Sequence, residues 1–465
     1  MLLKNNKEKF NKLKTFLNSN NVLTRLEERY CYAQDAANIQ EQTQTPDIIV
    51  FVQTIEDLQK VLKYANTHEI PVISRGAGTN MVGACTCLTG GIVLNFSKMN
   101  KILDINTTNL TATVQPGVIL GDLKKQVEDL DLFFPPDPSN YRVSTIGGGI
   151  AQSSGGANSF KYGTFKDYIL SLKVVLADGT IVTLGANTSK DSVGYHLNQL
   201  IVGSEGTLAI IAEATLKLIP KPEERRVITA YFDNVSNAVS AVDAIIKNNI
   251  FPSALDFMDK NSIQTVEDYS NCGFKTNYES LLIIQIDGIK NSIEFQLEKI
   301  CQSLTKTNAA EIFITNNESE SEKIWQARCA SFAATARLAP NVISDDIIVP
   351  RDKIPNMVEF CNSVIRKYKL KMCLVGHIGD GNLHPQIALD LENEAEFKNY
   401  IQAKSEIYEK TIELGGTISA EHGIGISKLS FFENSIDKNA LELMKLIKKS
   451  FDPKNILNPG KIFKL

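Results

Sequence analysis

The sequence is poor in histidine and tryptophan, and it carries no large surplus of charge of either sign. With a formal net charge of −4 over 465 residues, it lacks the basic excess that is typical of nucleic-acid binders. It contains no continuous apolar run of about 18 residues, so we expect no transmembrane segment. The N-terminal stretch MLLKNNKEKFNKLKTFL is rich in lysine and lacks the apolar core of a signal peptide. These absences predict a globular protein without a nucleic-acid partner.

Common cofactor motifs are also missing. The eight cysteines are scattered, and only Cys85 and Cys87 lie close together. This pattern lacks iron–sulfur and zinc-finger spacings and suits reduced thiols in the cytoplasm. No GxxxxGK(S/T) motif is present, and no glycine-rich loop is a strict GxGxxG. Nucleoside-triphosphatases and Rossmann dinucleotide enzymes are therefore disfavoured. We expect a cytoplasmic protein, and peripheral attachment to a membrane remains compatible with the sequence.

The chain is long enough for two or three domains. From Pro46 to about Lys221, short apolar strands alternate with amphipathic helices, as in an α/β domain. The Ile-Pro and Lys-Pro dipeptides of IPKPEERR mark a domain boundary. Beyond it, strands and longer helices indicate an α+β domain with an antiparallel sheet. We predict an N-terminal helical segment, a first domain, a second domain and a C-terminal segment, with bounds 1–40, 41–221, 222–415 and 416–465.

Two local signals in the first domain predict specific structures. Thr54 precedes an amphipathic helix and is the expected N-cap. Asp178 and Gly179 lie between two alternating apolar runs, which predicts a β-hairpin with a type I′ turn.

Two glycine-rich loops in the first domain are candidates for phosphate binding. One is RGAGTN, Arg75 to Asn80, directly after a predicted strand, and the other is VSTIGGGIAQSSGG, from Val143 to Gly156. Glycines let backbone N–H groups surround an anion, and the side chains of Arg75, Thr79 and Asn80 are further candidate donors. Either loop alone could be an ordinary turn, but two in one α/β region favour a phosphate site.

The stretch GHIGDGNLH holds two of the five histidines, His377 and His384, at the end of an apolar strand. A lone histidine is more often a buried core residue than a ligand. Here Gly379 and Gly381 would let the chain fold back and bring both imidazoles together. Glu421, in SAEHGIG, offers a carboxylate, and two imidazoles with one carboxylate suit a divalent metal with open positions.

Four separated motifs occur in an order that resembles a known family. RGAGTN, VSTIGGG…SGG followed by YG, and VGSEGTLAII resemble the vanillyl-alcohol oxidase/p-cresol methylhydroxylase family of FAD enzymes. The order RGAGT, GHIGDGNLH, SAEHGIG and LNPGK is similar to its D-2-hydroxy-acid dehydrogenase branch. The resemblance covers roughly residues 40 to 465. It implies an α+β protein with a two-subdomain FAD-binding α/β domain, an α+β substrate (cap) domain, and a C-terminal segment that returns to the flavin domain.

The resemblance also implies which residues hold the FAD. They are Arg75, Gly76, Ala77, Gly78, Thr79, Asn80, Ser144, Thr145, Gly147, Gly148, Gly155, Gly163, Glu205, Gly206 and Ile210. Some relatives attach the flavin through a histidine in the first loop. Because this chain has threonine and asparagine there, we expect non-covalent FAD.

The same resemblance implies a metal and two catalytic residues. His377, His384 and Glu421 would hold a divalent ion, for which zinc, iron(II) and manganese are all suitable. His422, next to a ligand but not itself bound, is the candidate proton acceptor, and the alternative is a structural hydrogen bond. Arg328, in KIWQARCAS, is the candidate clamp for the substrate carboxylate. In an amphipathic helix it could equally be a solvated arginine.

Two departures from the branch bear on the substrate. Relatives acting on hydroxyglutarate carry an asparagine where this chain has Gln386, and a lysine where it has Ser344, ahead of Asp345 and Asp346. We therefore expect a small D-2-hydroxy acid, D-lactate or glycolate. The alternatives are D-2-hydroxyglutarate or another 2-hydroxy acid, an alcohol or aldehyde oxidase on the same fold, and a metal-binding protein that has lost its flavin. The expected electron acceptor is a quinone, an electron-transferring flavoprotein or an iron–sulfur subunit; a homodimer is left open.

Overall fold

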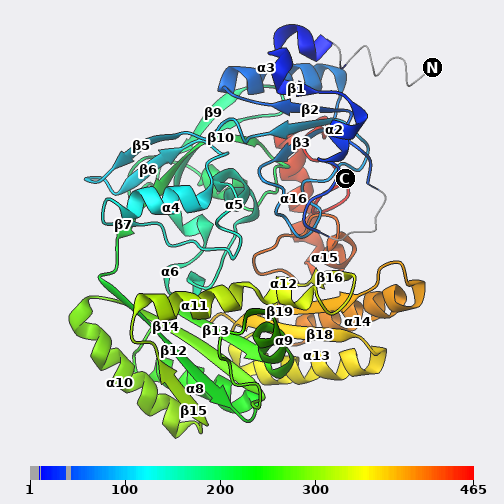
Figure 1. The fold of residues 1–465 in the computed structure, drawn as a ribbon. Helices are drawn as coiled ribbons and strands as arrows, with labels where there is room; N and C mark the ends of the chain where they lie inside the picture. Colours follow the sequence, from blue (N-terminus) through cyan, green and yellow to red (C-terminus); the bar gives the residue numbers. More distant parts are fainter. Residues whose placement is uncertain (1–9, 11, 38–42) are drawn as a thin grey trace.

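The computed structural model describes residues 10, 12–37 and 43–465, which are arranged around three main sheets (Figure 1). Part of the predicted N-terminal helical segment lies outside these residues. Within the described part, residues 12–16 are helical, and helix α2 (Leu26–Tyr30) follows a short strand. That strand, β1 (Val22–Leu23), pairs with the next strand of the chain, so the segment is not helical throughout.

The first sheet is small and parallel at its centre, in the order β1-β2-β4-β3. Its further strands are β2 (Ile48–Phe51), β3 (Val72–Arg75) and β4 (Ile92–Asn95). Helix α3 (Ile55–His68) connects β2 to β3 and buries one apolar face, as its periodicity predicts. The predicted N-cap is confirmed, because the Thr54 hydroxyl accepts a hydrogen bond from the Asp57 N–H at 3.1 Å.

The second sheet is antiparallel, in the order β5-β6-β10-β8-β9. Its strands are β5 (Ile102–Asn106), β6 (Thr111–Val114), β8 (Ile169–Val175), β9 (Ile181–Gly185) and β10 (Ile210–Lys217). The helices of this part are α4 (Leu120–Glu128), α5 (Ile146–Gln152), α6 (Ser159–Tyr162) and α7 (Leu197–Ile201). Two short strands, β7 (Leu132–Phe133) and β11 (Ile219–Pro220), pair where the chain leaves the first domain.

The predicted hairpin is confirmed as β8 and β9, but the predicted turn type is wrong. A type I′ turn needs positive φ at both central residues, whereas only Gly179 (φ 84°), not Asp178, has it. The N–H of Gly179 donates to the Leu176 carbonyl, and the N–H of Leu176 donates to the Thr180 carbonyl, both at 2.9 Å. The glycine therefore closes a longer loop instead of forming half of a two-residue turn.

The second domain is built on one antiparallel sheet, in the order β15-β12-β14-β13-β18-β19-β16, with β17 paired to β19. Its strands are β12 (Glu224–Phe232), β13 (Ala254–Asp259), β14 (Ser280–Gly288), β15 (Glu311–Ile314), β16 (Asn341–Ser344), β17 (Ile347–Ile348), β18 (Lys371–His377) and β19 (Asn382–Leu389). The antiparallel sheet predicted for this domain is confirmed.

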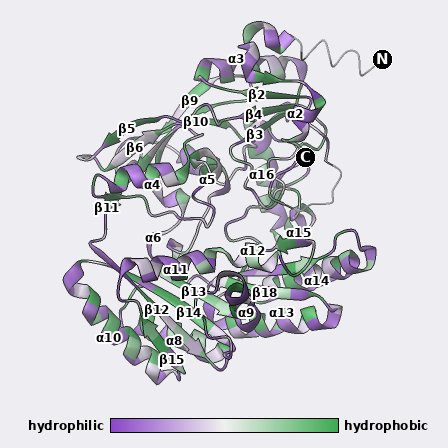
Figure 2. Cartoon of the chain, in the orientation of Figure 1, coloured by the Kyte–Doolittle hydropathy of each residue, from purple (hydrophilic) through white to green (hydrophobic). Residues whose placement is uncertain are grey.

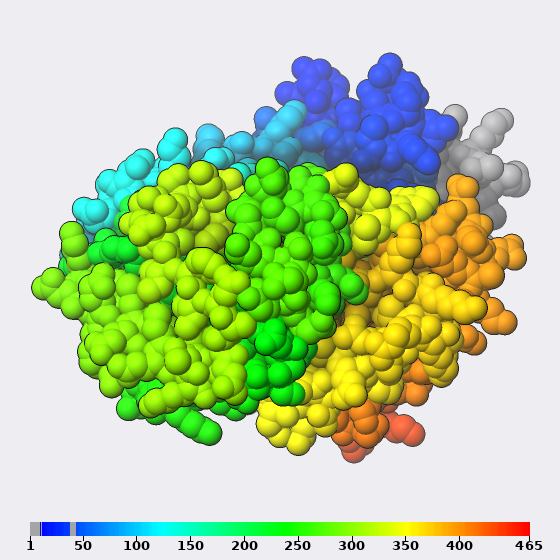
Figure 3. All heavy atoms as spheres, turned by 60° about the horizontal axis from the view of Figure 1, so that its bottom comes forward, coloured from blue at the N-terminus to red at the C-terminus, as the bar shows by residue number. Residues whose placement is uncertain are grey.

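Helices cover both faces of this sheet, and Figure 2 shows its strands as largely hydrophobic. One face packs against α8 (Val235–Lys247), α10 (Lys290–Lys306), α13 (Ile354–Tyr368) and α14 (Glu394–Glu413). The other face packs against α9 (Lys260–Ser270), α11 (Glu318–Cys329) and α12 (Ser331–Thr335). Figure 3, seen from the side of the second domain, shows this domain in green to orange in front of the blue and cyan first domain.

The C-terminal segment returns to the first domain through helices α15 (Leu429–Ser435) and α16 (Lys438–Phe451). The Asn458 N–H donates to the Val72 carbonyl of β3 at 2.8 Å. The buried Lys448 ammonium donates to the carbonyl of Thr207 at 2.8 Å and pairs with Asp452. Among the helices of the described chain, none combines the length and the apolar character needed to cross a membrane.

Candidate active site

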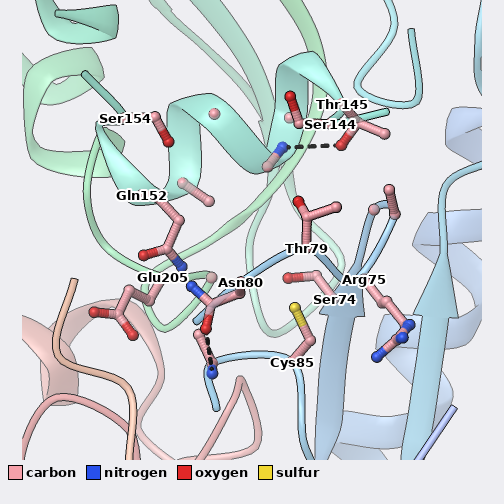
Figure 4. Close-up of a pocket in the computed structure, with 18 of the residues that line it drawn as sticks. Ser74, Arg75, Thr79, Asn80, Cys85, Ser144, Thr145, Gln152, Ser154 and Glu205 are labelled. Atoms are coloured by element: carbon pink, nitrogen blue, oxygen red, sulfur yellow. Dashed lines mark hydrogen bonds between the residues drawn. The ribbon is translucent and has the colours of Figure 1, made fainter. Parts of the chain in front are cut away.

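The two glycine-rich loops line one cavity of about 1250 Å³, open to solvent, in the first domain (Figure 4). It is bordered by the loop after β3, by the start of α5 and by the segment that precedes β10. Of the residues expected to hold FAD, those on its lining are Arg75, Gly76, Ala77, Gly78, Thr79, Asn80, Ser144, Thr145, Gly147, Gly148, Glu205, Gly206 and Ile210. Gly155 and Gly163 do not line it. A side chain at Gly155 would instead meet the Glu421 carboxylate at 2.7 Å.

Glycines bring the two loops into direct contact. A β-carbon at Gly76 would overlap the side chain of Thr145, so the loop after β3 can approach α5 only with glycine there. Gly148 faces open space apart from the Thr145 hydroxyl, which caps α5 by accepting the Gly148 N–H at 3.2 Å. Because Gly76 and Gly148 have no side chain, a ligand can come close to the backbone at both positions.

Two side chains that were expected to donate to a phosphate instead form hydrogen bonds with other groups of the protein. The Arg75 guanidinium points away from Thr79 (Figure 4), donates to the Gln34 carbonyl at 2.8 Å and lies over the Tyr32 ring. The Asn80 side-chain oxygen accepts the N–H groups of Val82 and Ala84, each at 2.9 Å. Both residues therefore fix the loop's shape, because a glycine-rich loop without such bonds would be mobile.

Polar atoms inside the cavity are left for a ligand. Ser144 Oγ, Gln152 Oε1 and Ser204 Oγ are buried on the lining and have no hydrogen-bond partner among the described residues. Buried polar groups are almost always paired in folded proteins. A large cavity with glycine backbone and unpaired buried oxygens fits a bound cofactor that carries hydrogen-bond donors and phosphates.

The GHIGDGNLH stretch forms the hairpin between β18 and β19. His377 ends β18 and pairs with Asn382, and His384 follows on β19. Gly381 has φ 88°, as a reversal at this point requires. Gly379 does not have positive φ; the Phe160 ring lies 2.8 Å from where its β-carbon would be. The fold-back expected from the two glycines is confirmed, but only Gly381 supplies it through its backbone.

Glu421 lies between the two histidines. Its Oε1 is 3.6 Å from His377 Nε2 and 3.3 Å from His384 Nε2. Two atoms bound at about 2.1 Å to one tetrahedral ion lie roughly 3.4 Å apart, so these separations fit a shared metal. Burial raises the pKa of the Glu421 carboxyl, but His377 and His384 outweigh it and hold that pKa well below its ordinary value. The carboxylate is thus ionised, as a metal ligand must be.

A second grouping of ligand atoms overlaps the first. Asp346, His384, Glu421 and His422 each place one candidate ligand atom within 4.8 Å of the others. Asp346 is a poor ligand, because its oxygens already accept hydrogen bonds from the Asn382 amide and from several backbone N–H groups. With Asp346 occupied in this way, the grouping leaves His384, Glu421 and His422 as candidate ligands, and the expected ligand His377 lies outside it.

Asp256, which sequence analysis did not single out, connects His377 to Arg328. Its Oδ1 lies 2.7 Å from His377 Nδ1, and its Oδ2 lies 2.7 Å from Arg328 Nε. Bonding at Nδ1 leaves His377 Nε2 facing Glu421, the arrangement seen around metal-bound histidines. An acidic residue in the interior of the strand ALDFMD, whose second aspartate stands at its end, was the available signal. Arg328 itself is buried, not solvated.

His422 lies where the cavity meets the histidine cluster. It lines the cavity together with Glu421, and its ring stacks on His384 with centroids 5.2 Å apart. Its Nδ1 is buried without a hydrogen-bond partner in the described structure. Burial lowers the pKa of His422 below its ordinary value of 6.5, although Asp346 opposes this shift. This shift favours the neutral ring, whose unprotonated nitrogen can accept a proton.

Comparison with known families agrees with this arrangement. Residues 46–185 match the FAD binding domain family, and residues 221–462 match the C-terminal domain of FAD linked oxidases. The chain is 42% identical to the glycolate oxidase subunit GlcD of Bacillus subtilis, over 94% of this chain and 92% of that protein. It is 34% identical to a D-lactate dehydrogenase of Anaerostipes hadrus, over 90% of this chain and 89% of that protein.

Solved structures share the fold at lower sequence identity. A p-cresol methylhydroxylase with bound substrate matches with a TM-score of 0.83 and 17% identity, covering 98% of this chain and 97% of its own. An alkyldihydroxyacetonephosphate synthase matches with a TM-score of 0.78 and 21% identity, covering 98% and 85%. The expected fold, a two-subdomain flavin domain with an α+β second domain, is confirmed. The chain belongs to the FAD-linked oxidases and is an FAD-dependent oxidoreductase.

Proposed function

We propose that this enzyme oxidises a small D-2-hydroxy acid, D-lactate or glycolate, to the 2-oxo acid, with non-covalent FAD and a divalent metal. The observation that carries the proposal is that the cavity lined by the glycine loops ends at Glu421 and His422. This lining supports a flavin next to Glu421 and His422; His377, His384 and Arg328 are not part of it. The relatives named as a glycolate oxidase subunit and a D-lactate dehydrogenase support this substrate class.

His377, His384 and Glu421 would hold the metal, and the loops around Gly76 and Gly148 would hold the FAD. When bound, FAD supplies a two-electron acceptor for the hydride that leaves the α-carbon, and the metal supplies a Lewis acid beside the hydroxyl. His422 takes the hydroxyl proton, which its neutral, unpaired Nδ1 favours. Substrate loses one hydride and one proton, so the oxidation to the 2-oxo acid is balanced.

Arg328 is the proposed carboxylate clamp. Its Nε lies 2.7 Å from Asp256 as an ion pair, and Nη1 donates to the Ser331 hydroxyl at 3.5 Å, so other N–H groups of the guanidinium remain as donors for a second acid. Beside it, Gln386 is buried and its amide is satisfied by Ser331 (3.2 Å) and Thr335 (3.0 Å). Gln386, which stands where relatives acting on hydroxyglutarate carry an asparagine, is thus held by its neighbours. We propose a short monocarboxylate over D-2-hydroxyglutarate on this sequence difference.

Electrons then leave the flavin for a separate acceptor: a quinone, an electron-transferring flavoprotein or an iron–sulfur subunit. Relatives named as glycolate oxidase subunits support a role within a complex. The proposed location is the cytoplasm, with peripheral attachment to a membrane as the alternative. The proposed oligomer is a homodimer.

The test is a substrate panel with an artificial electron acceptor. Glycolate, both lactate enantiomers, D-2-hydroxyglutarate and simple alcohols are compared at equal concentration. We expect turnover of glycolate or D-lactate and none of L-lactate. A preference for D-2-hydroxyglutarate would mean that the substrate is this dicarboxylate and not D-lactate or glycolate. Activity on alcohols alone would overturn the assignment to hydroxy acids.

A further inference from the structure

The loop from Ser419 to Gly425, which carries Glu421 and His422, lies between two buried carboxylates. One is Asp346, between β16 and β17 of the second domain. The other is Glu205, between α7 and β10 of the first domain. The loop forms no helix or strand, so its shape depends on what its backbone N–H groups bond to.

Asp346 binds the first half of this loop. Its Oδ2 accepts the N–H groups of three successive residues, Ala420 at 2.8 Å and Glu421 and His422 at 2.9 Å each. The Ser419 hydroxyl lies 3.0 Å from the same Oδ2 and 2.8 Å from the Gly423 carbonyl, and its single proton serves one of the two acceptors. The Oδ1 of Asp346 accepts the side-chain amide of Asn382, two residues before His384 on β19, at 2.8 Å. One carboxylate therefore ties the Glu421 backbone to the strand that carries His384.

Glu205 binds the second half. Its Oε1 accepts the Ile424 N–H at 2.7 Å, and its Oε2 accepts the Gly425 N–H at 2.9 Å. Gly423, between the two halves, has φ 81°, and a β-carbon there would lie 2.7 Å from Glu205 Oε1. Glu205 was expected among the FAD residues. In the structure it lines the cavity, and its carboxylate oxygens accept hydrogen bonds from this loop.

We propose that Asp346 and Glu205 are positioning residues, which hold Glu421 and His422 from opposite sides against the second and the first domain. Asp346 sets the distance between Glu421 and His384, and Glu205 sets the loop against the flavin cavity. The roles of Glu421 and His422 rest on the proposed function; the two-sided attachment rests on the hydrogen bonds alone. Hydrogen bonds from N–H groups to a buried carboxylate are strong enough to fix a loop to the tolerance that a catalytic site needs.

The test compares Asp346→Asn and Glu205→Gln with a matched control, Asp345→Asn. Asp345 is the adjacent buried carboxylate, but it faces α14, where it binds the Tyr408 hydroxyl (2.5 Å) and Lys404 (3.3 Å). An amide keeps the shape of either acid while turning one acceptor into a donor. Two readouts are needed: amide hydrogen exchange of residues 420–425, and affinity of the metal-free protein for Zn²⁺.

We expect exchange to rise about tenfold or more at 420–422 in Asp346→Asn and at 424–425 in Glu205→Gln. Zn²⁺ affinity should fall about 10–100-fold in Asp346→Asn. Asp345→Asn should lower the melting temperature but leave Zn²⁺ affinity and loop exchange unchanged. If Asp346→Asn does not fold, Asn382→Ala, which removes the donor to Asp346 Oδ1 without touching the loop, should show the same local exchange change at smaller size.

Unchanged exchange in both variants, or an equal effect of Asp345→Asn, would overturn the proposal. A wild-type protein that binds no Zn²⁺ would contradict the proposed metal site, while the exchange data would still decide the loop attachment. The two failures are therefore distinguishable.

Discussion

Replacing Asp256 with asparagine should weaken metal binding and substrate binding together. The side chain is 1% exposed, and its two oxygens separately engage His377 and Arg328, each at 2.7 Å. Burial raises the pKa of this carboxyl, but His377 and Arg328 outweigh it, so the residue is ionised. An asparagine can accept from only one of the two partners and turns an N–H₂ toward the other. It also leaves the Arg328 charge unpaired.

The magnitude follows from these contacts. Losing one charge-assisted bond and leaving a buried cation unpaired should lower the free energy of unfolding by about 3 kcal/mol. Metal affinity should fall about 10–100-fold, because His377 loses the partner that orients it. KM for the hydroxy acid should rise as well, since Asp256 also holds Arg328. Zn²⁺ titration and steady-state kinetics at saturating metal measure the two effects separately.

Asp259→Asn is the matched control. Asp259 lies on the same strand and is buried, but it binds only Ser262 and the Leu374 N–H. Its substitution should affect stability without changing metal affinity or KM. If Asp256→Asn keeps wild-type metal affinity and KM, or behaves like Asp259→Asn, the reasoning on Asp256 is wrong.

Three further predictions concern the cavity, the clamp and pH. Gly76→Val should weaken FAD binding by about 1–3 kcal/mol, roughly 5–150-fold, because the new side chain collides with Thr145; normal flavin content after purification would contradict this. Arg328→Lys keeps the charge but loses the planar fork, so KM should rise about tenfold or more with unchanged FAD content; an unchanged KM would exclude Arg328 as the clamp. Because burial lowers the pKa of His422 below 6.5, the rate of flavin reduction should fall only as pH drops below that value, where the ring becomes protonated. The pH profile of His422→Gln should lack this inflection. If the inflection persists in His422→Gln, the titrating group is not His422.

The order of elements was readable from the sequence because apolar periodicity and glycine positions are local. The strands, the α3 cap and the β18–β19 hairpin with His377 and His384 followed from such patterns, whereas Glu421 was joined to these histidines through its carboxylate chemistry and the family resemblance. The turn at Asp178-Gly179 was misjudged, because the dipeptide does not reveal that the loop continues to Thr180.

Partners distant in the sequence could not be predicted in the same way. Asp256 meets His377 across 121 positions, and Asp346 meets Glu421 across 75. No spacing rule encodes such pairs, which depend on sheet order and on the return of the C-terminal segment. The direction of a loop side chain is equally hidden. Arg75 was a reasonable phosphate donor from its motif, yet the structure directs it to Gln34.

The most direct test of the proposed function is anaerobic stopped-flow bleaching of the flavin under single turnover. This measurement needs no electron acceptor, so it observes only the reductive half-reaction. With glycolate or D-lactate, the wild-type flavin should bleach rapidly. His422→Ala and His422→Gln, which keep both FAD and metal, should bleach about 10²–10⁴-fold more slowly. Bleaching at the wild-type rate in both variants, or a wild-type flavin that neither acid reduces, would contradict the account.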